Sequence, residues 1–213
     1  MKYNTINTII DDILLEINRG NISESEQLSR NQIEQWIIQY RAVLLKQDID
    51  KNRDINNQYI QYLNSVELSQ HRIGVGRNNV LKSTTTIPET IDFHFRSGIV
   101  DVRDSFGNEI QFSTERRAMI QQDRRYTSSE YISYIKGKYI YVSGPGLIES
   151  VNVALIAVNP FDISGFSADD VYPMPANMIP PMKDMIIQKE IRHMLVADDT
   201  NNAKDDTNIQ ANK

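Results

Sequence analysis

The chain contains no cysteine, a single tryptophan and no long uninterrupted apolar run. The absence of cysteine excludes disulfides, thiolate nucleophiles and cysteine metal sites, and it leaves open whether the compartment is reducing or oxidising. No segment approaches the roughly 18 apolar residues of a membrane-spanning helix. The amino-terminal apolar run contains Asp11, Asp12 and Glu16, whereas a signal peptide would keep that run uncharged. We therefore expect a soluble protein with no membrane partner.

An excess of basic charge is also missing. The 213 residues carry a net charge of −5, and their hydrophobic share of 40% and charged share of 24% are ordinary for a globular chain. Residues 1–102 contain 11 basic and 13 acidic side chains, and the remainder contains 12 and 15. Neither half is basic enough to act as a general nucleic-acid clamp.

Catalytic and cofactor motifs are absent as well. The sequence has no P-loop, and Gly74-Val75-Gly76 has asparagine at position 79, where a dinucleotide loop needs its third glycine. The histidines lack the helical spacing of a zinc protease, so we expect surface or core positions for them. Neighbouring carboxylates on a helix or tail do not face one cleft, so the acidic pairs are interpreted as solvated. We expect no enzyme and no cofactor. The histidines are His71, His94 and His193, and the acidic pairs begin at Asp11, Asp169, Asp198 and Asp205.

Two amphipathic helices are predicted at the amino-terminal end. Thr5 caps the first, whose apolar residues repeat at spacings of three and four, and Gly20 ends it. Ser29 and Gln32 fit a capping box for the second, Ser29–Asp50. A short polar connector between them predicts antiparallel packing. The apolar stripe of the second helix consists of Ile33, Trp36, Ile37, Tyr40 and Leu44, and we place Glu34, Gln35, Arg41 and Lys46 away from it.

The middle of the chain changes to a period close to two, which predicts strands. We expect strands at 59–69, 80–87, 99–102 and 151–158, a turn at 105–108, a short helix at 113–122 and a hairpin at 131–142. Pro88 predicts that the strand at 80–87 is an edge strand. The nearly continuous apolar run at 151–158 predicts that this strand is central. Gly144-Pro145-Gly146 is interpreted as a tight turn. A helix at 182–197 follows a proline-rich approach.

The expected fold class is therefore α+β: an N-terminal antiparallel helix pair, a β-rich middle, a C-terminal closing helix and a flexible tail. We assign residues 1–55 to the helical part and 56–170 to the β-rich part. Residues 171–197 form a proline- and methionine-rich segment with the closing helix, and residues 198–213 form a mobile acidic tail that cannot bury enough apolar surface to order itself.

Two groups of residues are candidates for binding partners. Arginines in ERRAMIQQDRRY could bind nucleic-acid phosphates or form ion pairs between subunits, and both alternatives stay open. Methionine-rich apolar surfaces adapt to different partners, while docking of a closing helix on its own domain explains the same pattern. The first group is Arg116, Arg117, Arg124 and Arg125. The candidates for an interface with another subunit or another protein are Trp36, Tyr40, Leu44, Tyr172, Pro173, Met174, Met182, Ile186, Ile187, Ile191, Met194 and Leu195.

Six segments together resemble the head-to-tail connector (adaptor, or ring) proteins of tailed bacteriophages, most closely those of crAss-like phages. The segments are INTIIDDILLEI, SRNQIEQWIIQYRAVLLKQDIDK, YIQYLNSVELS, VLKSTTTIP, KYIYV and YPMPANMI, and they span most of residues 1–195. None of them is a catalytic fingerprint. Related proteins carry cysteines in the loop after the strand, and residues 70–79 here contain none, so a metal-binding form of that loop has no support.

The resemblance implies a structural virion protein that is made in the host cytoplasm and located at the portal vertex. It implies a homo-oligomeric ring, commonly of twelve copies, that contacts the portal protein and further ring or tail proteins. DNA would pass through the channel without sequence-specific binding, and a mildly acidic channel would avoid sticking to it. The alternatives are another virion component, either a second ring or a tail hub protein, and a nucleic-acid-binding accessory factor.

Overall fold

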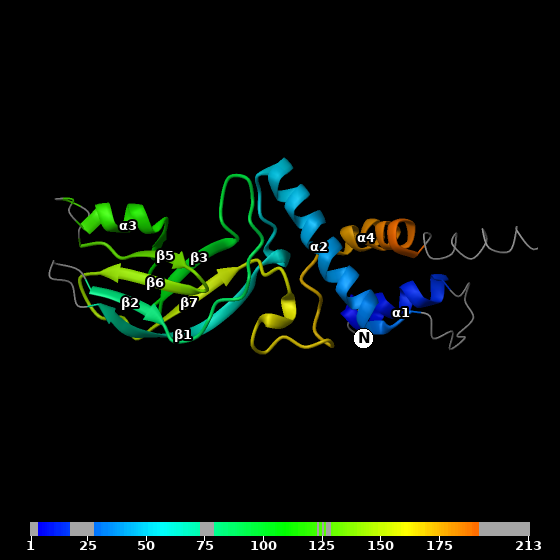
Figure 1. Cartoon of the computed structure of the whole chain (residues 1–213), viewed down its shortest axis with the longest axis horizontal. Coiled ribbons are helices and arrows are strands. Elements are labelled where there is room, and N and C mark those ends of the chain that lie inside the picture. The colour runs from blue at the N-terminus through cyan, green and yellow to red at the C-terminus, as the bar shows by residue number, and fades with distance from the viewer. Residues whose placement is uncertain are drawn as a thin grey trace, which may run out of the picture. The chain divides into compact units, whose positions relative to one another are not determined.

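The computed structural model describes residues 4–17, 28–72, 79–122, 124, 126 and 129–191 (Figure 1). The chain forms two compact units. Unit 1 combines residues 1–45 with residues 168–213, and unit 2 consists of residues 46–167. The described part of unit 1 is mainly helical and unit 2 contains a seven-stranded sheet, so the predicted α+β class is confirmed. None of the helices in the described ranges has the length and apolar character needed to span a membrane.

Helices α1 (Ile6–Ile17) and α2 (Arg30–Asn52) confirm the two predicted amino-terminal helices. The Thr5 hydroxyl accepts a hydrogen bond from the Thr8 backbone N–H at 3.2 Å, which caps α1. The first bonds of α2 run from the N–H groups of Gln32 and Ile33 to the Ser29 carbonyl, so this helix begins where the sequence predicts. The position of Gly20 lies outside the described residues.

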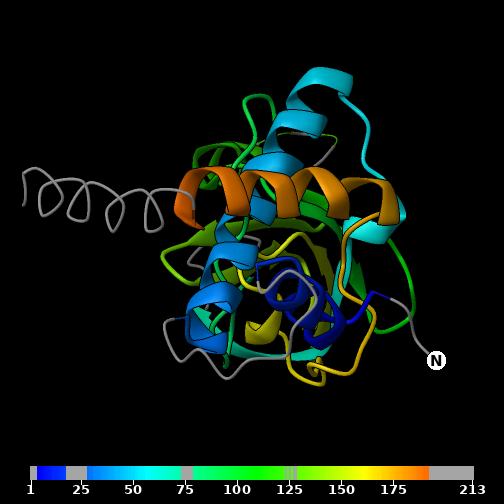
Figure 2. The ribbon, with the colours of Figure 1, turned by 90° about the vertical axis from the view of Figure 1, so that its right-hand side faces the viewer.

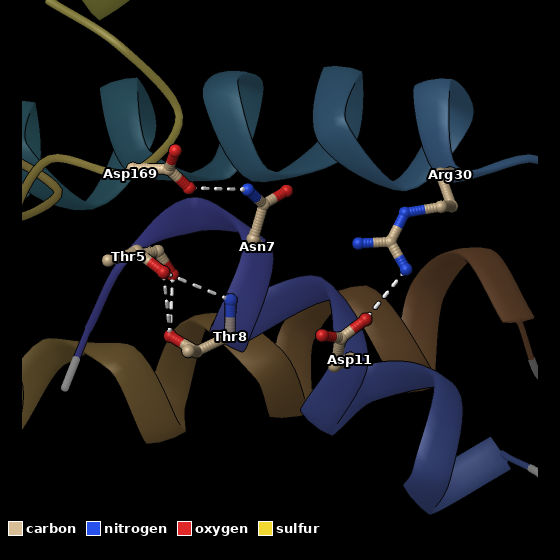
Figure 3. A network of polar contacts seen from close by, with 6 residues as sticks. All are labelled: Thr5, Asn7, Thr8, Asp11, Arg30 and Asp169. Atoms are coloured by element: carbon tan, nitrogen blue, oxygen red, sulfur yellow. Dashed lines mark hydrogen bonds and ion pairs between the residues drawn. The ribbon is translucent and has the colours of Figure 1, made fainter. Parts of the chain in front are cut away.

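Polar contacts tie α1 to its neighbours within unit 1. Figure 3 shows α1 and the start of α2 running in opposite directions, with the Arg30 guanidinium 2.6 Å from the Asp11 carboxylate. The Asn7 amide donates to Asp169 at 3.3 Å, which links α1 to the segment that returns from the sheet. These groups are exposed, so they orient the elements more than they stabilise them. Burial of Ile6, Ile9, Ile10 and Ile13 supplies the apolar contribution of α1.

Arg41 corrects the predicted polar face of α2. Its side chain is completely buried, donates from Nε to the Pro173 carbonyl at 3.1 Å and lies over the Tyr172 ring at 5.7 Å. Burial lowers the pKa of its guanidinium to about 10, because the charged form loses its hydration. From the sequence we place Arg41 away from the apolar stripe, yet it is buried because the 171–175 segment, distant in sequence, packs against this side of α2.

Helix α4 (Ile179–Ile186) is followed by a π-helical turn, Ile187–Ile191. Pro180 and Pro181 lie in the first turn of α4, where proline's missing N–H costs nothing. The helix begins three residues before the predicted start, and its predicted end lies outside the described residues. Figure 2 shows α4 crossing α2, and the Tyr40 hydroxyl donates to the Glu190 carboxylate at 2.5 Å from one helix to the next.

The sheet of unit 2 has the order β3-β7-β1-β2-β6-β5-β4. All neighbours are antiparallel except β4 and β5, which are parallel. The predicted strands, the hairpin and the 105–108 turn are confirmed, but β2 lies between β1 and β6 and is not an edge strand. Its ladder ends at Ser83, so Pro88 lies beyond it and removes no bond. The strands are β1 (Gln61–Arg72), β2 (Asn79–Ser83), β3 (Ile99–Asp104), β4 (Gln111–Phe112), β5 (Ile132–Lys136), β6 (Tyr139–Gly144) and β7 (Ser150–Leu155).

The sheet curls until its two edges meet. A bulge in β1 places Ser65 at φ +53°, and the Asn152 side chain accepts a hydrogen bond from the Ser65 N–H at 2.8 Å. Bulges of this kind increase local twist and bend a strand. At the opposite edges, the Ile110 N–H just before β4 donates to the Val102 carbonyl of β3 at 2.7 Å. The concave face encloses the main core, which includes Leu81, Val102, Ile140, Val142 and Val153.

Gly144 and Gly146 have a packing role that the sequence interpretation missed. A Cβ atom on Gly144 would lie 2.0 Å from the Tyr131 ring, and one on Gly146 would lie 2.6 Å from the Tyr131 hydroxyl oxygen. The glycines therefore accommodate an aromatic ring against the backbone as well as a change of direction after β6.

Candidate functional site

Helix α3 (Glu115–Gln122) lies on the outer face of the curled sheet (Figure 1). Thr114 starts it, since the Ala118 N–H donates to the Thr114 carbonyl at 3.0 Å. Ala118 is buried in a second, smaller core with Ile132, Tyr134 and Tyr141, in which the two tyrosine rings stack 5.4 Å apart. One side of α3 is thereby fixed on β5 and β6.

An ion pair holds the first turn of α3 on the sheet. The Lys136 ammonium of β5 lies 2.6 Å from the Glu115 carboxylate. The hydrogen bond to Glu115 and its charge raise the pKa of Lys136 above its ordinary value. Glu115 is therefore engaged by the sheet, and it does not neutralise the arginines that follow it in sequence.

The opposite side of α3 is exposed and carries both apolar and basic groups. Met119 and Ile120 are 55% and 48% exposed. Arg116, Arg117 and Arg124 are exposed too, and no ion pair joins them to any other described residue. We call these five residues the α3 surface. Arg125 lies outside the described residues. The exposed part of α3 thus carries two of the four predicted arginines beside two apolar side chains, and Arg124 is exposed just past the end of the helix.

An acidic groove is present elsewhere on unit 2. One hollow of about 620 Å³ is lined by Glu89, Asp92 and Asp162, with Lys138 as a cation on its wall. A second hollow of about 470 Å³ shares Thr86, Pro88 and Asp162 with the first and adds Glu67. The carboxylates of Glu89 and Asp92 are exposed and form no hydrogen bond or ion pair with another described residue, whereas Asp162 accepts from the Asn159 amide at 3.0 Å. We call the two hollows together the acidic groove.

Most predicted interface residues lie inside unit 1. Tyr40, Leu44 and Ile187 are half-buried, so parts of their side chains reach the surface. The apolar character of the others is explained by packing within the chain, and their role in subunit or portal contacts stays a prediction. Met194 and Leu195 lie outside the described residues. The buried members are Trp36, Tyr172, Pro173, Met174, Met182, Ile186 and Ile191.

Among the predicted interface residues that carry a polar side-chain group, Tyr172 is the most completely buried. Its side chain is 1% exposed, and its hydroxyl has no hydrogen-bond partner among the described residues. Burial raises the pKa of this hydroxyl well above its ordinary value, and the nearby Arg41 cation only partly offsets that rise. The pair of Arg41 and Tyr172 therefore forms a polar centre inside unit 1 and is not a surface for a partner.

The remaining chemistry-bearing residues are dispersed. The His71 ring packs nearly perpendicular to the Tyr141 ring, the His94 backbone N–H donates to Asp50, and His193 lies outside the described residues. Asp11 and Asp12 face Arg30 and Lys183 at 2.6 and 3.4 Å. Within the described ranges, no three of the side chains that commonly bind metals come together.

Sequence reasoning missed Met119, Ile120 and the acidic groove. The two apolar residues could have been found, because helical spacing places them away from the side of α3 that carries Ala118 and Gln121, next to the arginines. The groove could not, since its carboxylates come from β1, from the 84–98 connection and from the segment after β7. Only the folded sheet brings these residues together.

An exposed apolar pair flanked by arginines is typical of proteins that bind other macromolecules. The comparison with protein families shows which kind of macromolecule-binding protein this chain is. Residues 8–207 match the model of the family described as phage tail ring protein 2, a family of crAss-like phage ring proteins, and the chain belongs to this family. A search of curated proteins gives no match. The protein is therefore a phage tail ring protein, a structural component of the virion, and the resemblance stated from the sequence is confirmed.

Proposed function

We propose that this ring protein is a head-to-tail connector at the portal vertex. In this role a homo-oligomeric ring sits between the portal protein and further ring or tail proteins, and DNA passes through its channel. The family match across residues 8–207 is the observation that supports the proposal most directly. The role needs binding surfaces and no catalytic group, which agrees with an exposed α3 surface and dispersed titratable residues.

The charge balance supports a conduit that does not retain DNA. The net charge of −5 is spread over both halves of the chain, and weak repulsion lets a polyanion slide. Binding of double-stranded DNA to the purified ring, titrated against salt, should be weak at all salt concentrations. Tight binding that falls steeply with salt would instead favour a nucleic-acid-binding accessory factor.

Native mass measurement of the full chain, with and without the portal protein, tests the ring. A dodecamer of a 24.5 kDa chain has a mass of about 294 kDa. We expect this mass, or another closed multiple, alone or bound to portal. A monomer under both conditions would contradict the connector role. Binding to a tail protein but not to portal would favour the alternative of a tail hub or second ring.

The portal contact is proposed to involve the segment after α4. Deleting residues 182–213 is a poor test, because Met182, Ile186 and Ile191 are buried and their loss would damage unit 1. Deleting residues 192–213 leaves every described residue in place. We expect this shorter chain to lose co-sedimentation with portal while keeping its thermal unfolding midpoint. Unchanged co-sedimentation would place the portal contact elsewhere.

A further inference from the structure

The α3 surface and the acidic groove are complementary in charge. We propose that the α3 surface of one copy docks into the acidic groove of the next copy, and that repetition of this head-to-tail contact closes the ring. This inference rests on the proposed ring and goes beyond it by naming the two surfaces that meet. A contact between two different patches is heterologous, which is what a cyclic ring requires.

The charges account for the pairing. Arg116, Arg117 and Arg124 are exposed and form no ion pair with another described residue, and the side chains of Glu89 and Asp92 have no hydrogen-bond partner there either. Arginine forks bind carboxylates with two parallel hydrogen bonds, so these groups match in geometry as well as in charge. Complementary charge mainly sets the orientation and the choice of partner.

The apolar groups match as well. Met119 and Ile120 are about half exposed on α3, and the groove wall includes Ile87, Pro88 and Ile135 between its carboxylates. An apolar centre with a polar rim is the usual anatomy of a protein interface. Methionine adapts its shape to such a wall.

The groove of the same chain is not available to its own α3. Successive side chains of a strand point to opposite faces of the sheet. On β5, Tyr134 packs in the α3 core and Lys136 pairs with Glu115, whereas Ile135 faces the main core and lines the groove. The α3 surface and the acidic groove therefore lie on opposite faces of one strand, so the partner is a second copy.

The same arginines could bind DNA phosphates. A phosphate-binding surface gains nothing from the exposed Met119 and Ile120 beside the cations, since contacts to the DNA backbone are polar. The two apolar side chains therefore favour a protein partner, and DNA binding becomes an outcome of the test.

Disulfide trapping in the full-length chain tests the contact directly. The natural chain has no cysteine, so every introduced thiol reports one position. Met119→Cys places a thiol on the α3 surface, and Thr86→Cys places one in the groove, at an exposed residue that lines both hollows. Mixing the two single variants under mild oxidation should give mainly the 119–86 heterodimer. A chain carrying both changes should give a ladder of multimers.

Charge reversal provides a second test with a built-in rescue. Two charge-reversed chains are tested, Arg116→Glu/Arg117→Glu and Glu89→Lys/Asp92→Lys. Each should lower the ring yield by at least about tenfold, because the α3 surface of one copy and the groove of the next then carry charges of the same sign. A mixture of the two variants, or one chain with all four changes, should recover the ring. Lys138→Ala removes a cation from the groove and should strengthen assembly. Lys46→Glu/Lys51→Glu carries a matched charge change at exposed residues of α2 and should assemble like wild type.

The outcomes separate this inference from the connector proposal. If the chain with Met119→Cys and Thr86→Cys forms rings but gives no 119–86 disulfide under oxidation, or if rings survive charge reversal, the docking inference is overturned and the ring proposal stands. If wild-type rings bind DNA measurably, and Arg116→Glu/Arg117→Glu forms unchanged rings that no longer bind it, the arginines belong to the channel instead. Absence of rings in wild type, alone and with portal, would overturn the connector proposal itself.

Discussion

Helices α3 and α4 are both eight residues long, and both contain methionine and isoleucine, yet they use them differently. Helix α4 buries Ile179, Met182 and Ile186 inside unit 1. Helix α3 buries Ala118 and leaves Met119 and Ile120 exposed. The comparison shows that apolar composition alone does not identify a docking surface. The informative residue is a large apolar one that the fold leaves uncovered.

Truncation of one methionine in each helix should give the largest difference in the free energy of unfolding. Met182→Ala removes a completely buried side chain and should lower the free energy of unfolding by about 2–5 kcal/mol. Met119→Ala changes an exposed side chain and should stay within about 0.5 kcal/mol of wild type. Urea unfolding followed by circular dichroism measures both. Equal losses would mean that α3 is as much a core helix as α4.

Tyr172→Phe probes the polar centre beside α2. The hydroxyl is buried and has no hydrogen-bond partner among the described residues, so its removal should stabilise the protein by about 1 kcal/mol at neutral pH. A loss of stability would show that the hydroxyl has a partner.

The same variant should change the response to alkali. The pKa of Tyr172 is raised in the folded protein, so its contribution to stability is full below the ordinary value of 10 and is lost as pH rises through the folded pKa. The pKa of Tyr40, raised to about 12 by its hydrogen bond to Glu190, acts in the same direction. Arg41, with a lowered pKa, acts in the opposite direction. Unfolding measured from pH 9 to 11 should therefore lose stability less steeply in Tyr172→Phe. Parallel curves would contradict the assigned shift.

Lys136→Ala should have the smallest effect, and a local one. It removes the ion pair that holds the first turn of α3, while Ala118 stays in its apolar core. Because the pair is largely exposed, we expect the unfolding midpoint to change little. Amide hydrogen exchange at Ala118 should become faster relative to that at Met182 in α4. Unchanged exchange at Ala118 would mean that the core contacts alone fix α3.

The sequence was informative where periodicity and local signals agreed. Helix α2, the β5–β6 hairpin and the 105–108 turn were predicted because each is determined by neighbours along the chain. Arg41 and β2 were misjudged because their surroundings come from distant segments: Pro173 covers the arginine, and β6 pairs with the outer side of β2. The candidate site likewise has one part that the sequence predicts and one part that depends on distant segments. Its arginines were found in the sequence, and the groove that complements them exists only after the sheet has curled.

The closure of the sheet has a consequence for the assembly of a ring protein. Open strand edges recruit further strands and promote uncontrolled aggregation. Here the backbone groups of Val102 and Ile110 join the two outermost strands to each other. These joined edges are not open to a strand of a second copy, which leaves recognition between copies to side chains, whose specific shape and charge favour a closed assembly over an open-ended fibre.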